Sequence, residues 1–418
     1  MTASDSRSEV DASVVLIGGQ ARMVLAVASS LGRRGIAVVH APMGAVEERM
    51  PSRHVRETLS IRRWLGTPEG FVAAVEAIAA RWPGALLIPL NDSALVGLAG
   101  VRDRGRFPVT FGCPAAEVVA RTIDKTETAR IATRLGIPVP RTFALPDAAS
   151  VEAQAARLTF PLFFKASDKI DHGRRHGGTD FGVGRHPDLA ALRAAFAADP
   201  AHGREYLFQE YCPGHDVLLS LLLHEGRVLA AFQARSLRTW PSTGGVTVLT
   251  RSEPVDPVLR EQLAALLREI GWEGLAQADF RRDPATGRTV LLEINGRFWG
   301  STFAAVQAGI DFPYYVWQLA RGETPQPPAD YRAGRMTHWA MGDLKRLLRL
   351  WRHPAAGESR VRELARFLAA LRPSVGGMMW RWDDPRPAWS EWSGDLRWFV
   401  LGAVRRLWRR LAGGKNPT

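Results

Sequence analysis

Two polar side chains stand two residues apart at the end of an apolar segment near position 300. Glu293 lies within the run 289–294, and Asn295 directly follows it. The run is rich in β-branched and aliphatic residues, as strands are. Side chains alternate between the faces of a strand, so the carboxylate and the amide point to the same side. Hard oxygen donors of this kind suit Mg²⁺, which takes oxygen ligands at roughly 2.0–2.1 Å and is often shared with substrate phosphates. The spacing therefore predicts a magnesium-binding face.

A third oxygen donor, Asp279, ends the alternating segment 274–280. The intervening residues 281–288 are rich in Asp, Pro and Gly, which predicts a hairpin turn. Such a hairpin brings Asp279 beside Glu293. Taken singly, each of these residues is more often a solvent-facing acid or a capping amide. Three oxygen donors in register favour a metal site.

The elements before this hairpin have the pattern of an α/β protein. Residues 14–19 form an apolar strand that ends in glycines, and a helical pattern over 21–31 and a strand over 36–40 follow. A helix over 71–81 leads to a strand over 85–92, which ends near Asp92. The segment 18–23 lacks the glycine spacing of a dinucleotide-binding turn. We therefore expect an α/β domain without a cofactor of its own, with Asp92 facing a substrate cleft.

The middle of the chain predicts a second set of strands and helices. Asp124 and Glu127 have the spacing of a capping box at the start of a helix, which Gly136 and Pro138 end. A helix over 258–270 precedes the metal hairpin. Four further apolar segments read as strands: 160–165, 206–211, 217–223 and 227–234.

This order of features resembles the ATP-grasp ligases over residues 122–318. Asp279, followed fourteen positions later by Glu293-Ile294-Asn295-Gly296-Arg297, is similar to the metal-binding end of that family. Its pattern is an acid or amide on one strand and Glu-x-Asn-x-Arg on the next, usually with Pro at the position of Gly296. The resemblance implies mixed α/β and α+β architecture. We expect a disordered N-terminus over 1–12, a Rossmann-like pre-ATP-grasp domain over 13–114, a two-part ATP-grasp domain over 115–330, and a helical basic extension over 331–418.

The resemblance also implies phosphate contacts. Lys125 and Lys165 stand where the family places its two basic phosphate ligands, and lysines can neutralise phosphates as point charges. The glycine-rich loop 172–178, with Gly177 and Gly178, is a candidate phosphate cover because glycine lets backbone N–H groups approach closely. Two surface lysines and a plain flexible loop are the alternative reading.

An adenine and ribose site is implied upstream of the metal hairpin. Gln209, Glu210, Tyr211 and Cys212 are similar to the family's hinge, where the carbonyl of Glu210 and the N–H of Cys212 would bind the adenine edge. Asp216 falls where the family has a ribose-binding carboxylate, which can accept from both hydroxyls. An acid in a Pro-Gly turn explains Asp216 equally well.

Two arginines are candidates for stabilising a transferring phosphoryl group, because the planar guanidinium suits that role. Arg297 is the stronger candidate and Arg235 the weaker, and a structural ion pair is the alternative for each. The implied reaction uses ATP with Mg²⁺ or Mn²⁺ to activate a carboxylate as an acyl phosphate, which an amine then attacks. Carboxylation, simple phosphorylation of a small substrate, and ATP binding without turnover remain alternatives.

The composition of the chain indicates its general class, its compartment and where its charge lies. The chain has 418 residues with 46% hydrophobic and 23% charged, which is typical of a globular protein of two or three domains. Two cysteines in unlike contexts, with no apolar leader pattern, predict a reducing cytoplasm. Of the net charge of +13, the segment 331–418 carries +11, with 18 Lys and Arg against 7 Asp and Glu.

This basic tail holds 8 of the 14 tryptophans and two helical patterns, 343–353 and 395–411. The second has apolar residues on one side and arginines on the other, so it could lie on an anionic membrane surface. Packing against the ligase domain with arginines outward is slightly favoured. No recognised module supports specific nucleic-acid binding. Small carboxylates and amines are the expected partners, and the oligomeric state is left open.

Overall fold

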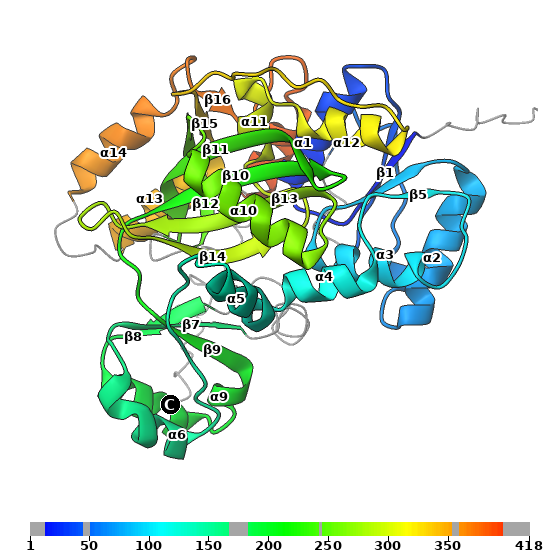
Figure 1. The fold of residues 1–418 in the computed structure, drawn as a ribbon. Coiled ribbons are helices and arrows are strands. Elements are labelled where there is room, and N and C mark those ends of the chain that lie inside the picture. The colour runs from blue at the N-terminus through cyan, green and yellow to red at the C-terminus, as the bar shows by residue number, and fades with distance from the viewer. Residues whose placement is uncertain (1–12, 45–50, 167–182, 242–244, 353–358, 396–418) are drawn as a thin grey trace, which may run out of the picture.

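The structure, a computed structural model, describes residues 13–44, 51–166, 183–241, 245–352 and 359–395. The predicted disordered segment 1–12, the candidate loop residues Gly177 and Gly178, and the predicted helix beyond residue 395 lie outside the described residues. In Figure 1 the N-terminal domain lies on the right, a large sheet occupies the centre, and a small lobe lies at lower left.

The N-terminal domain is built on a parallel five-stranded sheet of order β3-β2-β1-β4-β5, all of it within the predicted 13–114. The central order is that of a Rossmann-like sheet. Its apolar strands are buried on both faces, as parallel sheets require. The elements are β1 (Val14–Ile17), α1 (Ala21–Gly32), β2 (Val38–Ala41), β3 (Glu57–Thr58), α2 (Pro68–Arg81), β4 (Leu86–Pro89), α3 (Asp92–Arg102) and β5 (Thr110–Phe111).

Two helices, α4 (Ala116–Ile123) and α5 (Lys125–Arg134), connect this domain to the rest. Asp124 caps α5 by accepting from the N–H groups of Thr126 and Glu127, as the sequence predicts. Glu127 does not form the reciprocal half of the expected capping box, because its carboxylate pairs with Arg130. The cap fixes Lys125 at the first position of the helix.

The small lobe contains an antiparallel sheet of order β6-β9-β7-β8 with a separate apolar core. Its strands β7 and β9 carry Lys165 and the predicted adenine hinge. The elements are β6 (Thr142–Phe143), α6 (Ala148–Gln154), β7 (Leu162–Ala166), β8 (Val183–His186), α8 (Leu189–Ala198), α9 (His202–Glu205) and β9 (Tyr206–Glu210).

The large sheet has the order β14-β13-β10-β11-β12-β15-β16. Helix α10 (Pro257–Ile270) covers one face, and α1 and α11 pack toward the other. The predicted metal hairpin is present, with Asp279 paired to Glu293 and a bulge next to that pair. The strands and following helices are β10 (His215–His224), β11 (Arg227–Trp240), β12 (Val246–Glu253), β13 (Gly274–Arg282), β14 (Thr289–Asn295), α11 (Thr302–Ala308) and α12 (Phe312–Ala320).

The C-terminal extension is not purely helical, because β15 (Met336–His338) and β16 (Gly376–Gly377) add two short strands to the large sheet. Helix α13 (Ala340–Arg352) matches the predicted helix 343–353, and α14 (Arg360–Ala369) follows it. The buried carboxylate of Asp343 contacts Arg238 of β11 at 2.8 Å, and Asp383 contacts Arg33 of the N-terminal domain at 2.8 Å. The described part of the extension therefore packs on the domains before it.

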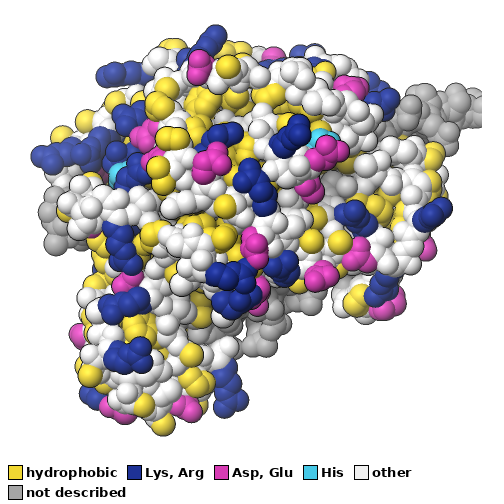
Figure 2. All heavy atoms as spheres, viewed as in Figure 1, with side chains coloured by type: hydrophobic (Ala, Val, Ile, Leu, Met, Phe, Trp, Pro, Cys, Tyr) yellow, Lys and Arg dark blue, Asp and Glu magenta, His cyan; other side chains and the backbone are white. Residues whose placement is uncertain are grey.

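Basic side chains are spread over the face shown in Figure 2, where acidic side chains lie among them. Within the described ranges, no helix combines the length and the apolar character that crossing a bilayer requires.

Candidate nucleotide and metal site

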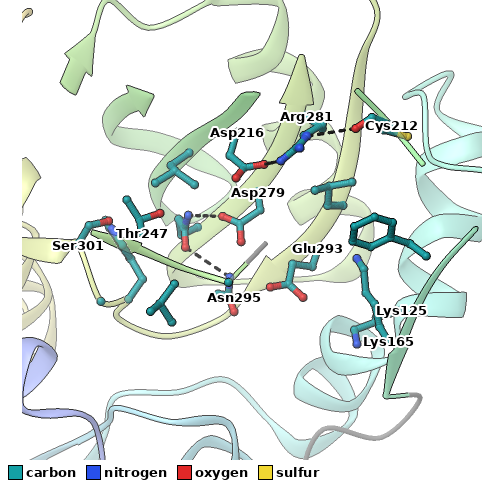
Figure 3. Close-up of a pocket in the computed structure, with 18 of the residues that line it drawn as sticks. Lys125, Lys165, Cys212, Asp216, Thr247, Asp279, Arg281, Glu293, Asn295 and Ser301 are labelled. Atoms are coloured by element: carbon teal, nitrogen blue, oxygen red, sulfur yellow. Dashed lines mark hydrogen bonds and ion pairs between the residues drawn. The ribbon is translucent and has the colours of Figure 1, made fainter. Parts of the chain in front are cut away.

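A cavity of about 380 Å³ lies between the large sheet, the small lobe and the start of α1. Three of its polar residues are the predicted metal ligands Asp279, Glu293 and Asn295. The hairpin register explains their convergence, since Asp279 lies opposite Glu293, and Asn295 lies opposite Gln277 on the same face. Figure 3 shows the three side chains in the middle of the cavity.

Gln277, which the sequence analysis did not single out, connects these ligands. Its amide nitrogen donates to Asp279 Oδ1 at 2.5 Å, and its amide oxygen accepts from Asn295 Nδ2 at 3.4 Å. Gln277 is 3% exposed, so its amide is fixed by the strand and by these two partners. It occupies the position two residues before Asp279, which the alternation rule places on the same face.

The two predicted phosphate-binding lysines line the same cavity. Lys125 comes from the start of α5 and Lys165 from β7, so they approach from different elements. In Figure 3 both lie on one side of the cavity, next to Glu293. Two ammonium groups beside a cluster of carboxylates form an arrangement that suits a polyphosphate with a divalent cation.

The predicted adenine hinge also lines the cavity, because β9 ends there. Gln209 is buried and donates to Thr142 Oγ1 at 3.1 Å, while Tyr211 stacks on Phe163 with ring centroids 5.6 Å apart. Burial opposes the charge of Glu210, but hydrogen bonds from the Arg141 N–H and from the guanidinium groups of Arg288 and Arg141 outweigh it and lower the pKa of that carboxyl.

The side chain of Glu210 is therefore engaged with Arg141 and Arg288, whereas the predicted adenine contacts are those of the backbone at Glu210 and Cys212. Burial raises the pKa of the Cys212 thiol, and Glu210 adds to the effect. This keeps the thiol protonated at neutral pH, so Cys212 is suited to packing rather than to nucleophilic chemistry.

Asp216, the predicted ribose ligand, lies in the cavity and is paired with Arg281 at 2.6 Å. Arg281 also donates to the carbonyl of Cys212 at 3.2 Å, so it connects β13 to the end of the hinge. Figure 3 shows this chain of contacts above the metal ligands. The hydrogen bond from Arg281 uses Oδ1 of Asp216.

Arg297 reaches the cavity, but its donors are engaged. Nε and Nη2 donate to the two carboxylate oxygens of Asp92 at 2.8 and 3.0 Å, and Nη1 donates to the carbonyl of Phe298 at 3.0 Å. Although burial acts against it, the pKa of Arg297 is raised by Asp92 and by Glu293 and Asp279. The geometry gives Arg297 a structural ion pair beside the metal ligands.

Arg235 does not reach this cavity. It pairs with Val217, whereas the cavity-lining Asp216 and Leu218 lie on the other face of β10. Val217 belongs to the apolar core on the α10 side, so Arg235 points to that side as well. Arg235 therefore does not join Arg297 at this cavity, because its side chain lies on the opposite face of the sheet.

Arg22 is a further cavity residue that the sequence analysis missed. It lies in the first turn of α1, is 4% exposed, and its guanidinium stacks on Trp339 at 3.8 Å from the ring centroid. It donates to Thr247 O at 3.2 Å and to Gln20 Oε1 at 3.0 Å. The missed signal is an arginine three positions after Gly19, in the first turn of the helix of a β-α-β unit.

The side chains of Asp279, Glu293 and Asn295 supply only some of the oxygen ligands that a divalent cation needs. No cluster of three or more His, Cys, Asp or Glu side chains is arranged for a metal within the described residues. Two carboxylates and one amide are instead present, and Mg²⁺ in proteins usually completes its coordination with water and phosphate oxygens. The residues therefore fit a cation that arrives with a phosphate ligand.

Comparison with known proteins agrees with this geometry. Residues 202–340 match a family model described as ATP-grasp in the biosynthetic pathway with Ter operon. The chain is 27% identical over 234 residues to a D-alanine–D-alanine ligase of Ectopseudomonas mendocina, covering 52% of this chain and 70% of the relative.

Solved structures share the fold. An L-amino acid ligase from Bacillus licheniformis superposes with a TM-score of 0.57 at 16% identity, covering 78% of both chains. A biotin carboxylase from Campylobacter jejuni gives 0.58 at 15% identity, covering 78% of this chain and 74% of the other. Residues 202–340 thus match an ATP-grasp family model, and the chain shares its fold with solved ligase and carboxylase structures.

Proposed function

We propose that this protein is an ADP-forming ligase that joins a small carboxylate to an amine. The observation that carries the proposal is the convergence of Asp279, Glu293 and Asn295 with Lys125 and Lys165 around one cavity. Support comes from the relatives that are named D-alanine–D-alanine ligases and from the fold shared with an L-amino acid ligase.

The residues divide the work by charge. Lys125 and Lys165 would bind the phosphates of ATP, and the hinge at Glu210 and Cys212 would hold its base through the backbone. Asp279, Glu293 and Asn295 would hold Mg²⁺, which supplies charge neutralisation at the phosphates. Positioning and electrostatics thus carry the catalysis, and no nucleophilic side chain is needed.

The chemistry has two steps. A carboxylate oxygen forms a bond to the γ-phosphorus as the bond from that phosphorus to ADP breaks, which gives an acyl phosphate. The amine nitrogen then bonds to the acyl carbon, phosphate leaves, and the amine proton passes to solvent. The net products are an amide, ADP and phosphate.

Purified protein with ATP and Mg²⁺, supplied with amino acids and small carboxylates singly and in pairs, tests the proposal. We expect ADP release that requires a carboxylate and an amide product detected by mass spectrometry. A phosphorylated or carboxylated product instead would assign the protein to another reaction. ADP release without any dependence on the added compounds would contradict the proposal.

A further inference from the structure

Three arginines line the cavity, and they differ in how their charge is compensated. Arg281 contacts the carboxylate of Asp216 at 2.6 Å, and Arg297 contacts both oxygens of Asp92. Arg22 hydrogen-bonds only to neutral oxygens in the described part of the chain, those of Thr247 and Gln20. Burying a guanidinium without a contacting carboxylate costs free energy, so binding of an anion beside Arg22 would be favourable.

The surroundings of Arg22 hold the charge without neutralising it. Trp339 supports one face of the guanidinium, and the indole N–H of Trp339 donates to Glu391 at 2.7 Å. Glu391 is the carboxylate that acts on Arg22 electrostatically, but within the described residues its side chain bonds to Trp339 and forms no ion pair with Arg22. Burial lowers the pKa of Arg22 to about 10, so Arg22 is still a cation at neutral pH.

Arg22 and Gly300 both line the cavity, and the glycine leaves space beside the guanidinium. A Cβ atom at Gly300 would lie 3.1 Å from Nη2 of Arg22, so glycine at this position keeps the approach open. Helix α1 adds a favourable field, because its first turn faces the same cavity through Arg22 and Met23 and contains no acidic residue.

The position of Arg22 relative to the metal ligands gives the anion a role. In Figure 3 Thr247 and Ser301 lie on one side of Asp279 and Asn295, and Lys125 and Lys165 lie on the other. Arg22 is bonded to Thr247, so it belongs to the end remote from the lysines. An anion held there and phosphates held at the lysines would meet at the metal ligands.

We propose that Arg22 binds the carboxylate of the substrate and thereby orients it toward the phosphate end of the cavity. This inference rests on the proposed ligase function and specifies its substrate site. The planar fork of arginine matches the two oxygens of a carboxylate, which a lysine cannot reproduce. Arg22 is thus a residue of the N-terminal domain that selects carboxylates over their neutral amides.

Binding measurements on the full chain, saturated with Mg²⁺ and the non-hydrolysable analogue AMP-PNP, test this inference. The probes are D-alanine, L-alanine and L-glutamate, each compared with its α-carboxamide, by isothermal titration calorimetry. In the wild type we expect at least one carboxylate to bind at least about tenfold more tightly than its amide, as a charge-assisted bidentate contact allows. Arg22→Gln should abolish this preference while the affinity for AMP-PNP stays unchanged.

Arg321→Gln is the matched control, because Arg321 also stacks on a tryptophan, Trp317, but lies outside the cavity and is exposed. That variant should keep the carboxylate preference. Arg22→Lys serves if Arg22→Gln does not fold, and we expect it to raise KM for the carboxylate without raising KM for ATP. Retention of the full preference in Arg22→Gln, or no preference in the wild type, would overturn the inference.

The outcomes separate this inference from the proposed function. Carboxylate-dependent ADP release with an unchanged carboxylate KM in the Arg22 variants would contradict the role of Arg22 but would still support the ligase function. Arg22-dependent carboxylate binding without any ADP release would support the carboxylate site but contradict the ligase function.

Discussion

Asp92 and Arg297 are joined by two hydrogen bonds of 2.8 and 3.0 Å although 205 positions separate them in the chain. Asp92 begins α3 of the N-terminal domain, and Arg297 follows β14, the strand of the predicted metal ligands. The pair thus ties the N-terminal domain to the strand that carries Glu293 and Asn295. Both side chains are largely buried, at 14% and 22% exposure for Arg297 and Asp92.

Loss of either partner should destabilise the protein, because the other charge would be left in a poorly hydrated site. We expect Asp92→Ala to lower the free energy of unfolding by about 3 kcal/mol. The double variant with Arg297→Ala should cost less than the sum of the single changes. Chemical denaturation measures both. In the exposed pair Arg193–Glu152, Glu152→Ala should cost much less, because both groups are well hydrated; equal losses at the two pairs would contradict this explanation.

Gln277 should control the affinity for the cation, because its amide orients Asp279 and Asn295. We expect Gln277→Leu, which keeps the volume but removes both hydrogen bonds, to raise the Mg²⁺ concentration needed for half-maximal ADP release by about 10–100-fold. Ser220 lies opposite Gln277, and its buried hydroxyl has no hydrogen-bond partner in the described structure. Ser220→Ala is therefore the control and should leave the Mg²⁺ titration unchanged. A Gln277→Leu titration that overlays the wild type would rule out this orienting role.

Gly296 stands where the family resemblance leads one to expect proline, and Trp272 explains the difference. A Cβ atom at Gly296 would lie 2.2 Å from the Trp272 ring, which is 2% exposed. We expect Gly296→Ala to cost about 1–3 kcal/mol through overpacking. The same change in a Trp272→Leu background should cost much less, because the ring is gone. Thermal or urea denaturation of the four proteins gives the comparison, and equal costs in both backgrounds would show that Trp272 is not the cause.

The small lobe should lose stability in mild acid. Its buried His186 stacks on Phe164 and hydrogen-bonds to His202 at 3.1 Å, and desolvation together with His202 lowers the pKa of His186 to about 4. The ordinary value is 6.5, so the unfolded chain takes up the proton first. The stabilisation is complete above pH 6.5 and is lost as the pH falls toward 4, by up to roughly 1.4 kcal/mol per pH unit.

The comparison of wild type with His186→Phe, unfolded in urea between pH 7 and pH 4, tests this expectation. The variant should show a shallower loss of stability. His40 of the N-terminal domain, whose pKa is lowered to about 4 by burial, should retain its own contribution in both proteins. Parallel pH profiles for wild type and variant would show that His186 does not titrate in this interval.

The convergence of Asp279, Glu293 and Asn295 can be predicted from the sequence because it depends on local structure. Glu293 and Asn295 share a face by strand alternation, and the short turn after Asp279 fixes which residues meet across the hairpin. The same reasoning identifies Asp124 as a helix cap. Each of these relationships spans fewer than about twenty residues, so periodicity and turn chemistry are enough.

Other parts of the site depend on long-range packing that no local pattern encodes. The face on which Arg235 lies depends on the register of β11 against β10, which the pattern of β11 alone does not reveal. The partner of Arg297 lies in another domain. The placement of Arg22 at the cavity could not be predicted, because it depends on contacts with Trp339 of the extension and Thr247 of the large sheet.

The proposed function depends on the assignment of Asp279, Glu293 and Asn295 as the metal end of a ligase active site. Its most direct test is steady-state, carboxylate-dependent ADP release by Glu293→Gln, with Glu261→Gln as a matched change on an exposed part of α10. We predict a loss of at least about a hundredfold in kcat for Glu293→Gln and wild-type rates for Glu261→Gln. Full turnover by a correctly folded Glu293→Gln protein would contradict the assignment.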